Sequence, residues 1–403
     1  MPATALEDRA LGPDLARGLM LLCIALANSH YFLDAPDVLG GYPLEKSPLD
    51  QGVTWLISTF VDGRAFPLFG LLFGYGVAQV VRRHPDRTRR LLFRRALVLI
   101  AIGWVHAIFL YVGDIVAAYG MLLVFGAWTV FWRDRWLLIW AAIFFVLTAL
   151  PSTGALETAM EGPSTAELPP DIGRMLVDRL PVQLFVMFLG PIGFACPFLI
   201  GLWSGRRRIL ERPTEHRRFL GVVAIGGIAA GVLGAQPLAR IVAGFEPVPS
   251  ESDFDVISAL HVLSGTLAGA GYAAAIALLS TRVRRGRVVR ALAATGQRSL
   301  TAYLAQSLVW ATAFTPFLLG LADDLSIAAN ALLATLTWLA TVVLCAALAS
   351  HGRRGPFETL LRRATYGRRD GPARPHEGVR VGAPHHAAAA HVDDPAPSRT
   401  RVR

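Results

Sequence analysis

Long apolar segments alternate with short polar connections along almost the whole of this chain. About ten of these segments approach or exceed the ~20 apolar residues that a helix needs to cross the ~30 Å hydrocarbon layer of a bilayer. They are residues 14–33, 53–81, 91–111, 114–131, 136–150, 181–204, 219–243, 255–280, 299–320 and 326–349. The pattern predicts an all-α fold, namely a polytopic transmembrane helical bundle of about ten spans.

The composition agrees with this prediction, because 54% of the 403 residues are hydrophobic and only 17% are charged. Arginines gather in three blocks, residues 82–95, 205–218 and 281–298, which alternate with connections rich in acidic residues. Basic residues accumulate in the cytoplasmic loops of membrane proteins, so the alternation predicts that both termini are cytoplasmic. Anionic lipid headgroups attract such blocks, so the net charge of +10 requires no nucleic-acid partner.

The chain divides into two predicted regions. Residues 1–351 form the transmembrane helical domain, and an external loop at 151–180 separates its two halves. Residues 352–403 form a cytoplasmic tail, in which HGRRGPFETLLRRATYGRR is predicted to form a short interfacial helix. The remainder of the tail is rich in Ala, Pro, His and Arg and is predicted to be mostly disordered.

Two titratable residues, His106 and Asp114, lie in the apolar stretch IGWVHAIFLYVGDIVAAYGMLLVFG. An ionisable residue inside the hydrocarbon costs on the order of 2.5–3.5 kcal/mol at mid-helix, so it suggests a functional site. The turn YVG joins the flanking spans into an antiparallel hairpin, which brings the two side chains together. A carboxylate orients the tautomer of an imidazole and raises its basicity, as a general base requires. The pair is therefore the predicted catalytic centre, near the external face.

Each member of this pair also has a structural interpretation. Asp114 begins a span, where a carboxylate caps free N–H groups and meets the positive end of the helix dipole. His106 can instead bond a neighbouring backbone carbonyl. The sequence leaves the choice between catalytic and structural roles open.

Three further spans bring polar residues to the same leaflet. Asn28 and His30 end the first span, Asp62 and Arg64 lie within the second, and His261 lies in the outer third of the eighth. Arg64 lies too deep to reach the interface, so it either clamps a substrate anion or forms a salt bridge between helices. Side chains at i and i+2 of a helix point apart, which argues against an Asp62 partner. His30 is alternatively a solvated interfacial residue.

Near the cytoplasmic face, Asp14 and Arg17 lie three residues apart in DLARG. They form either a local ion pair or part of a binding site for an anionic donor. In the ninth span, a polar track is predicted along TGQRSLTAYLAQSLVW, formed by Gln297, Thr301, Tyr303 and Gln306. Polar contacts between helices are the alternative role of this track.

No motif of a soluble enzyme is present: the chain lacks a Walker loop, HExxH, GxSxG and paired cysteines. Its three cysteines, Cys23, Cys196 and Cys345, lie inside apolar spans without metal-ligand spacing. We expect them to pack as small apolar side chains, and we expect no metal site.

Four segments resemble the YeiB-like family of bacterial membrane proteins, known as domain of unknown function 418. They are GPDLARGLMLLCIALANSHYF, DGRAFPLFGLLFGYGVA, LLFRRALVLIAIGWVHAIFLYVGDIVAAYGML and ATGQRSLTAYLAQSL. Together they span most of residues 9–350, and His106 and Asp114 lie at matching positions of the third segment. The resemblance implies a multi-pass protein of the bacterial cytoplasmic (inner) membrane.

The first segment is also similar to that of transmembrane acyltransferases, such as the heparan-glucosaminide N-acetyltransferase type. That similarity implies transfer of an acyl group from a cytosolic donor, often acetyl-CoA, to an acceptor across the membrane. One branch of those enzymes tends to carry histidine where this chain has Asn28, with His30 two residues further on. Because of this departure, we assign no catalytic role to Asn28.

The leading hypothesis is therefore a membrane-bound acyltransferase that acts on a surface or secreted acceptor. His106 is its predicted general base or acyl carrier, with Asp114 as the orienting carboxylate. Substrate contacts are predicted for Asn28, His30, Arg64, His261, Arg17, Tyr303 and Gln306. Acyl-CoA is the expected donor substrate rather than a permanently bound cofactor. The alternatives are a proton-coupled transporter or exporter of a small anionic molecule, and a non-catalytic membrane partner.

Overall fold

A computed structural model describes residues 11–150 and 154–367. These residues form fourteen α-helices, two 3-10 helices and one two-stranded hairpin. The first half contains α1 (Leu11–Ser29), η2 (His30–Phe32), β1 (Val38–Leu39), β2 (Tyr42–Pro43), α2 (Pro48–Phe60), α3 (Ala65–Arg83), η3 (Pro85–Arg87), α4 (Thr88–Phe109), α5 (Val116–Thr129), α6 (Asp134–Leu147) and α7 (Ala155–Ala159). The second half contains α8 (Ile172–Arg206), α9 (Arg217–Val242), α10 (Glu251–Ser280), α11 (Arg287–Gln297), α12 (Ser299–Phe314), α13 (Ile327–Ser350) and α14 (Pro356–Tyr366).

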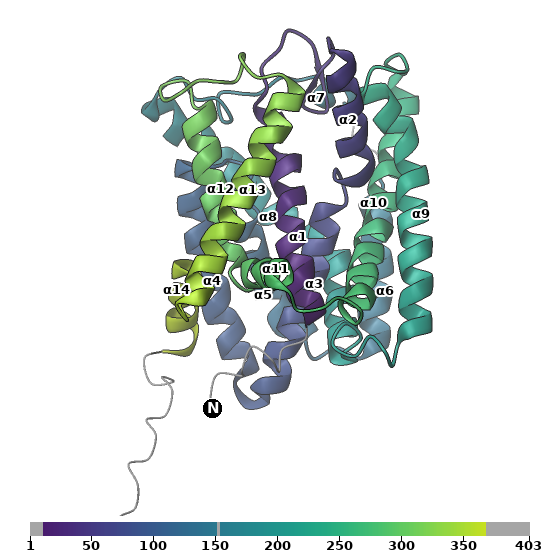
Figure 1. The fold of residues 1–403 in the computed structure, drawn as a ribbon, viewed down its shortest axis with the longest axis vertical. Helices are drawn as coiled ribbons and strands as arrows, with labels where there is room; N and C mark the ends of the chain where they lie inside the picture. Colours follow the sequence, from purple (N-terminus) through teal and green to yellow (C-terminus); the bar gives the residue numbers. More distant parts are fainter. Residues whose placement is uncertain (1–10, 151–153, 368–403) are drawn as a thin grey trace, which may run out of the picture.

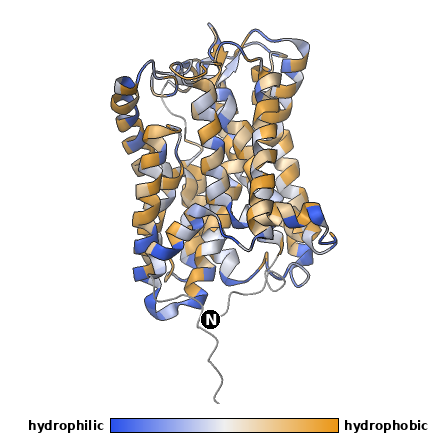
Figure 2. Cartoon of the chain, turned by 60° about the vertical axis from the view of Figure 1, so that its left-hand side comes forward, coloured by the Kyte–Doolittle hydropathy of each residue, from blue (hydrophilic) through white to orange (hydrophobic). Residues whose placement is uncertain are grey.

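Most of the long helices run side by side along one axis of the molecule (Figure 1). Seven helical segments of the described residues are long and apolar enough to cross a membrane. They are Leu11–Phe32, Pro48–Arg83, Pro85–Phe109, Ile172–Arg206, Arg217–Val242, Glu251–Ser280 and Ile327–Ser350. The hydropathy colouring shows apolar residues along these helices and polar residues gathered towards the two ends (Figure 2). The all-α prediction is confirmed.

Three of the ten predicted spans are shorter than expected. They correspond to α5 with 14 residues, α6 with 14 and α12 with 16. A helix rises 1.5 Å per residue, so these helices extend only about 21–24 Å and do not by themselves match the ~30 Å hydrocarbon layer. The ten-span count and the cytoplasmic location of both termini therefore stay predictions.

The second predicted span is a broken helix. α2 ends at Phe60 and α3 begins at Ala65, and Gly63 in the break has a positive φ of 71°. Its Cα faces the His261 ring, so a Cβ at this position would contact that ring. Only glycine adopts such a conformation readily, and its lack of a side chain also lets α10 approach. The break is therefore determined by the sequence, and it exposes backbone groups beside Asp62 and Arg64.

The basic segment 281–298 is not simply a connection. Its second half forms α11, an amphipathic helix that lies across the bundle and packs closely on α1 (Figure 1). Gly18 and Gly296 allow this approach, because a Cβ on either would meet the backbone of the other helix. The predicted short helix after residue 352 is also present as α14, which packs against α4 and α12. Residues 368–403, the predicted disordered part of the tail, lie outside the described residues.

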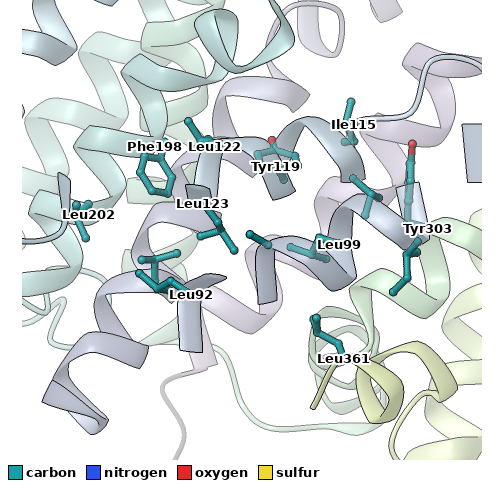
Figure 3. Packing of buried hydrophobic residues seen from close by; sticks show 14 of the residues in the cluster. Leu92, Leu99, Ile115, Tyr119, Leu122, Leu123, Phe198, Leu202, Tyr303 and Leu361 are labelled. Atoms are coloured by element: carbon teal, nitrogen blue, oxygen red, sulfur yellow. The ribbon is translucent and has the colours of Figure 1, made fainter. Parts of the chain in front are cut away.

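The largest apolar cluster lies where α4, α5, α8 and α12 meet (Figure 3). Leu99 of α4, Tyr119 of α5 and Phe198 of α8 are among its buried members, and Leu361 extends it to α14. Close packing of these side chains holds the helices together, because helices in a membrane associate through van der Waals contacts rather than through removal of apolar surface from water. Tyr303 also belongs to this cluster, so the packing fixes the surroundings of His106 from several helices.

Candidate functional site

His106 and Asp114 meet as the sequence predicts, and we call them the dry pair. Nδ1 of His106 lies 2.8 Å from Oδ1 of Asp114, and their side chains are 1% and 0% exposed. His106 is in the last turn of α4, and Asp114 lies in the connection to α5. Gly103, one turn before His106, packs against Asp114 and the start of α5. A larger residue at that position would separate the two helices, so the local sequence determines the distance.

Asp114 also caps α5. Its two carboxylate oxygens accept hydrogen bonds from the backbone N–H groups of Val116 (3.0 Å) and Ala117 (2.8 Å). Caps of this kind satisfy N–H groups that have no partner within the helix. The structural role and the pairing with His106 are therefore both present, and the same carboxylate performs them.

The second ring nitrogen of His106 has no partner. A carboxylate oxygen accepts hydrogen bonds, so Nδ1 of His106 donates to Asp114, and Nε2 is the ring nitrogen left for another partner. Nε2 is buried and makes no hydrogen bond within the described residues. The ring of Tyr303 lies 5.1 Å away between centroids, and its hydroxyl is buried and makes no hydrogen bond to residues 11–150 or 154–367. A buried polar atom without a partner costs free energy, which suggests that this side of the imidazole serves a ligand or a reaction.

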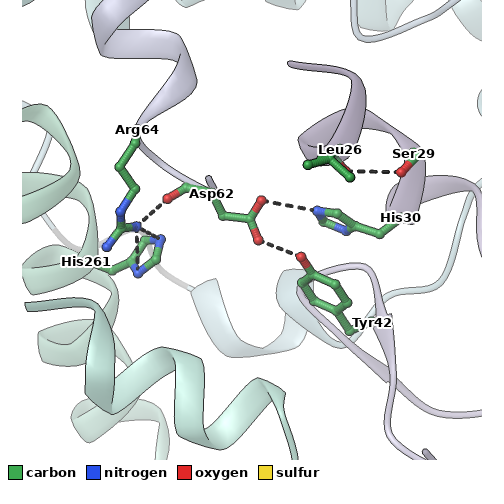
Figure 4. A network of polar contacts seen from close by, with 7 residues as sticks. All are labelled: Leu26, Ser29, His30, Tyr42, Asp62, Arg64 and His261. Atoms are coloured by element: carbon green, nitrogen blue, oxygen red, sulfur yellow. Dashed lines mark hydrogen bonds and ion pairs between the residues drawn. The ribbon is translucent and has the colours of Figure 1, made fainter. Parts of the chain in front are cut away.

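A second polar cluster, which we call the outer cluster, joins His30, Tyr42, Asp62, Arg64 and His261 (Figure 4). Nε2 of His30 lies 3.5 Å from Oδ1 of Asp62, and the Tyr42 hydroxyl donates to Oδ2 of Asp62 at 2.7 Å. The Tyr42 ring stacks on the His30 ring at 4.0 Å between centroids. Burial, followed by the nearby Asp62 charge, raises the pKa of Tyr42 well above its ordinary value, so its hydroxyl stays protonated and donates. Asp62 is thus the centre of this cluster.

Arg64 lies in the same cluster without contacting the Asp62 carboxylate. Its Nη1 donates to the backbone oxygen of Asp62 and to Nε2 of His261 at 2.8 Å, and its Nη2 donates to the Gly231 oxygen at 2.9 Å. Arg64 is 1% exposed. The predicted buried partner exists, but it consists of backbone oxygens and a histidine rather than a carboxylate. The Asp62 carboxylate points away from Arg64, as expected, but it does so because both residues lie in the turn between α2 and α3 and not on one helix (Figure 4).

The polar residues that the sequence predicts for the external leaflet form two clusters rather than the one expected site. Aromatic contacts lie between them: the His106 and Tyr111 rings are 6.3 Å apart, and Tyr111 and Phe32 are 5.5 Å apart. Phe32 ends the turn that begins with His30. Asn28 is buried in α1 close to this turn and is not part of either cluster. The two clusters are neighbours that the end of α1 separates.

The remaining predicted residues lie elsewhere. Arg17 pairs with Asp14 at 3.4 Å and donates to the Leu72 oxygen at 3.0 Å, as the ion-pair interpretation expects. The amide of Gln306 is buried and donates to the Leu21 oxygen at 3.3 Å. Only Tyr303 of the predicted polar track lies beside the dry pair. Gln297 donates to Asp14 at 2.9 Å, and Thr301 bonds Glu358 of α14 at 2.6 Å, so these two connect helices.

Sequence reasoning missed Tyr42 and did not include Asp62 among the substrate contacts. Tyr42 belongs to a short hairpin outside the helices, where no periodic pattern marks it. Its only signal is the preceding Gly40–Gly41, both with positive φ, which turns the chain back over the His30 ring. Across residues 11–150 and 154–367, no group of three or more His, Cys, Asp or Glu side chains is arranged to hold a metal ion.

The fold and the buried polar clusters define a helical protein of the membrane-spanning type. Residues 204–368 match the model of the family described as Protein of unknown function (DUF418). The Uncharacterized protein YxaH of Bacillus subtilis (strain 168) is 25% identical over 399 residues, which covers 88% of this chain and 93% of YxaH. These findings agree with the resemblance found in the sequence: residues 204–368 are similar to the DUF418 family, and YxaH is similar over most of the chain. The region that matches the family model includes His261 and Tyr303 but not the dry pair.

Proposed function

We propose that this protein transfers an acyl group from a cytosolic acyl-CoA donor to an acceptor on the opposite side of the membrane. The observation that carries the proposal is the unpartnered Nε2 of His106, on an imidazole whose other nitrogen is held by Asp114 at 2.8 Å. This is the arrangement that a general base needs: a fixed tautomer with a free lone pair.

The proposed transfer of the acyl group from the thioester to the acceptor hydroxyl needs no further reactant, because every bond formed or broken and every proton is accounted for. Nε2 of His106 takes the proton from an acceptor hydroxyl as its oxygen attacks the thioester carbonyl. The new C–O bond forms, the C–S bond breaks, and the thiolate leaves with the proton returned by the imidazolium. Asp114 stabilises the imidazolium through the hydrogen bond from Nδ1, as an orienting carboxylate does. Tyr303 packs its ring beside the imidazole, and its buried hydroxyl makes no hydrogen bond within the described residues, so we assign it a contact to the bound substrate.

The outer cluster suits recognition of the acceptor. Asp62 is 18% exposed, in contrast to the fully buried Asp114, and the cluster presents hydrogen-bond donors and acceptors from four separate parts of the chain. Polar acceptors such as sugars are recognised through several such groups. His30, Asp62 and Tyr42 are the proposed contacts, while Arg64 and His261 stabilise the break between α2 and α3.

The test uses inverted membrane vesicles that contain the protein, with acetyl-CoA labelled in the acetyl group added outside. Label that becomes stably attached to material inside the vesicles measures transfer. We expect His106→Gln to lower transfer by a factor of about 10² or more, as loss of a general base does, and Asp114→Asn to lower it less. His351→Gln, an exposed histidine outside both clusters, is the control. Wild-type incorporation equal to that of vesicles without the protein would exclude acetyl transfer.

One observation favours the alternative of proton-coupled transport. A helix broken inside an apolar span, with Asp62 and Arg64 at the break, is a feature of ion-coupled transporters. In that case Asp62 would carry the proton, so Asp62→Asn would abolish pH-driven flux of a small anion into liposomes. Under acyl transfer the same variant keeps the base His106 and loses only acceptor contacts.

A further inference from the structure

The packing of helices α3, α8, α9 and α10 leaves a crevice on one side of the bundle. α8 packs along α3 and α9 packs along α10, whereas α8 and α9 make little contact with each other. α9 lies at the edge of the bundle beside α10 (Figure 1). The crevice between α8 and α9 has a volume of about 290 Å³, and side chains of α3 and α10 also line it. It is therefore a lateral opening between helices that are long enough to cross a membrane.

The lining of this crevice is almost wholly apolar. Ile200 of α8, Val223 of α9 and Ala270 of α10 are among its members. The hydroxyl of Ser204, which also lines the crevice, is already satisfied because it donates to the Gly201 oxygen at 3.1 Å. Such a lining suits a hydrocarbon chain better than water, since a buried water molecule needs several polar partners.

Trp203 adds a hydrogen-bond donor to this apolar lining. Its indole Nε1 is shielded from solvent and makes no hydrogen bond to residues 11–150 or 154–367. The Phe219 ring lies edge-on to the Trp203 ring at 6.3 Å between centroids, and the Arg207 guanidinium lies over the indole at 5.2 Å. A buried indole N–H usually has an acceptor, because leaving it unpaired costs free energy. Trp203 therefore indicates that an acceptor oxygen belongs at this end of the crevice.

Positive charge gathers at the end of the crevice that Phe219 lines. Arg217 and Arg218 are the first residues of α9, directly before Phe219, and both are exposed. The acidic residues of the preceding connection, Glu211 and Glu215, form ion pairs with other arginines. Basic side chains at a membrane surface attract anionic lipid headgroups. The charge at this end of the crevice therefore matches a phosphate.

The crevice extends from this charged end into the apolar part of the bundle. Phe219 and Gly227 of α9 both line it, and eight residues of helix extend about 12 Å. At Gly227 the helices α9 and α10 touch, because a Cβ there would meet the Leu267 oxygen. Along this direction the order is charge, hydrogen-bond donor and apolar channel. A molecule with an anionic head, an ester group and a hydrocarbon tail presents the complementary order.

We propose that the crevice between α8 and α9 binds one acyl chain of an anionic phospholipid. Its phosphate lies at Arg217 and Arg218, and an ester carbonyl accepts a hydrogen bond from Nε1 of Trp203. Arginine binds phosphate through charge-assisted hydrogen bonds. No lining residue of the crevice belongs to the dry pair or to the outer cluster. The site is therefore independent of the proposed acyl transfer.

The test measures the phospholipid that stays bound to the detergent-purified protein. The protein is incubated with equal amounts of phosphatidylglycerol and phosphatidylcholine and analysed by native mass spectrometry. We expect the wild type to retain one phosphatidylglycerol molecule. Ala270→Phe fills the crevice and should abolish this retention, whereas Ala229→Phe, the same enlargement at an exposed position of α9, should not.

Two further variants separate the contacts. Trp203→Phe keeps an aromatic ring and removes the N–H, so it should weaken retention by about 2- to 10-fold, as loss of one hydrogen bond does. Arg217→Gln combined with Arg218→Gln should lower the preference for phosphatidylglycerol over phosphatidylcholine by about 10-fold or more. Arg87→Gln combined with Arg90→Gln, which removes two exposed arginines beside the start of α4, is the matched control.

Retention of phosphatidylglycerol by Ala270→Phe and Trp203→Phe at the wild-type level would overturn the crevice as the site. An unchanged lipid preference in the Arg217 and Arg218 variant would overturn the assignment of the headgroup. A wild-type dimer that carries no lipid and that Ala270→Phe separates would overturn the proposal in favour of a second copy of the chain. Trp203→Phe keeps the packing of the crevice, so it tests the site even where Ala270→Phe lowers the melting temperature.

Discussion

The two histidine–aspartate pairs of this protein are built from the same residue types, but they differ in interatomic distance, in the exposure of the aspartate and in the hydrogen bonds that the aspartate accepts. His106 and Asp114 lie 2.8 Å apart and are almost fully buried, whereas His30 and Asp62 lie 3.5 Å apart and Asp62 keeps 18% of its side chain exposed. Both carboxylate oxygens of Asp114 accept hydrogen bonds, from two helix N–H groups and from the imidazole. Asp62 accepts one short hydrogen bond from Tyr42, and its other oxygen, although close to His30, makes no hydrogen bond.

This comparison shows which parts of the fold position each pair. The dry pair comes from one hairpin, where eight residues and a close contact at Gly103 set the distance. The outer cluster is assembled from η2, β2, the break between α2 and α3, and α10. A tightly held pair has a single geometry, which suits the proposed base. A cluster drawn from several elements adjusts more easily, which suits recognition of a polar acceptor.

The largest difference between the pairs should appear when each aspartate is removed. Asp114→Ala leaves a buried imidazole and two helix N–H groups without an acceptor, so we expect the free energy of unfolding to fall by about 3–5 kcal/mol. Asp62→Ala should reduce it by less, because Asp62 is partly exposed and is not a helix cap. Unfolding in detergent micelles, followed by circular dichroism, measures both values. Equal losses would show that the two pairs are held alike.

A smaller effect on the free energy of unfolding is expected when the Tyr42 hydroxyl, which bonds Asp62, is removed. Tyr42→Phe removes the hydrogen bond to Asp62 and keeps the stacking on His30, so it should lower the free energy of unfolding by about 0.5–1.5 kcal/mol. Tyr31→Phe, at a half-exposed neighbour that also packs on His30, is the matched control and should have no effect. Under the proposed function, Tyr42→Phe should raise the KM for the acceptor and leave CoA binding unchanged.

The smallest effect is a pH dependence of stability that comes from Lys46, the chain's single lysine. Lys46 lies in the same connection as Tyr42. Its Nζ donates to the Val242 oxygen at 2.5 Å. Burial lowers the pKa of Lys46 from 10.5 to about 8, although the Asp50 charge raises it. The unfolded chain therefore binds more protons than the folded one between about pH 8 and 10.5, so stability should rise slightly over that window and be unaffected below it.

The same residue tests the orientation of the bundle. A membrane-impermeant amine reagent should modify Lys46 in intact cells, with a rate that reaches half its maximum near pH 8, because only the neutral amine reacts. Lys46→Arg abolishes this labelling and is the control. Labelling that requires broken cells would reverse the predicted topology and would place the outer cluster on the cytoplasmic side.

Most of the long helices and one of the two histidine–aspartate pairs, the dry pair, can be predicted from the sequence alone. Apolar segments of sufficient length predict most of the long helices, and the YVG turn predicts the meeting of His106 and Asp114. These properties are local, since they depend on helix period and on residues a few positions apart. The same local pattern overestimated α5 and α12, because apolar loops around Leu110 and Thr315 continue the hydropathy signal beyond the helix ends.

Only the tertiary structure decided the partners of the isolated charges. Arg64 is separated by 197 residues from His261, and Tyr42 reaches Asp62 through a hairpin that no periodicity marks. Arg179 donates to the backbone oxygens of Ala166 and Ile108, and this pairing is equally invisible in the sequence. A charge in an apolar segment signals that some partner must exist, because burial without one is unfavourable. Which atom supplies that partner depends on how distant helices pack, and this is settled only when the whole bundle has folded.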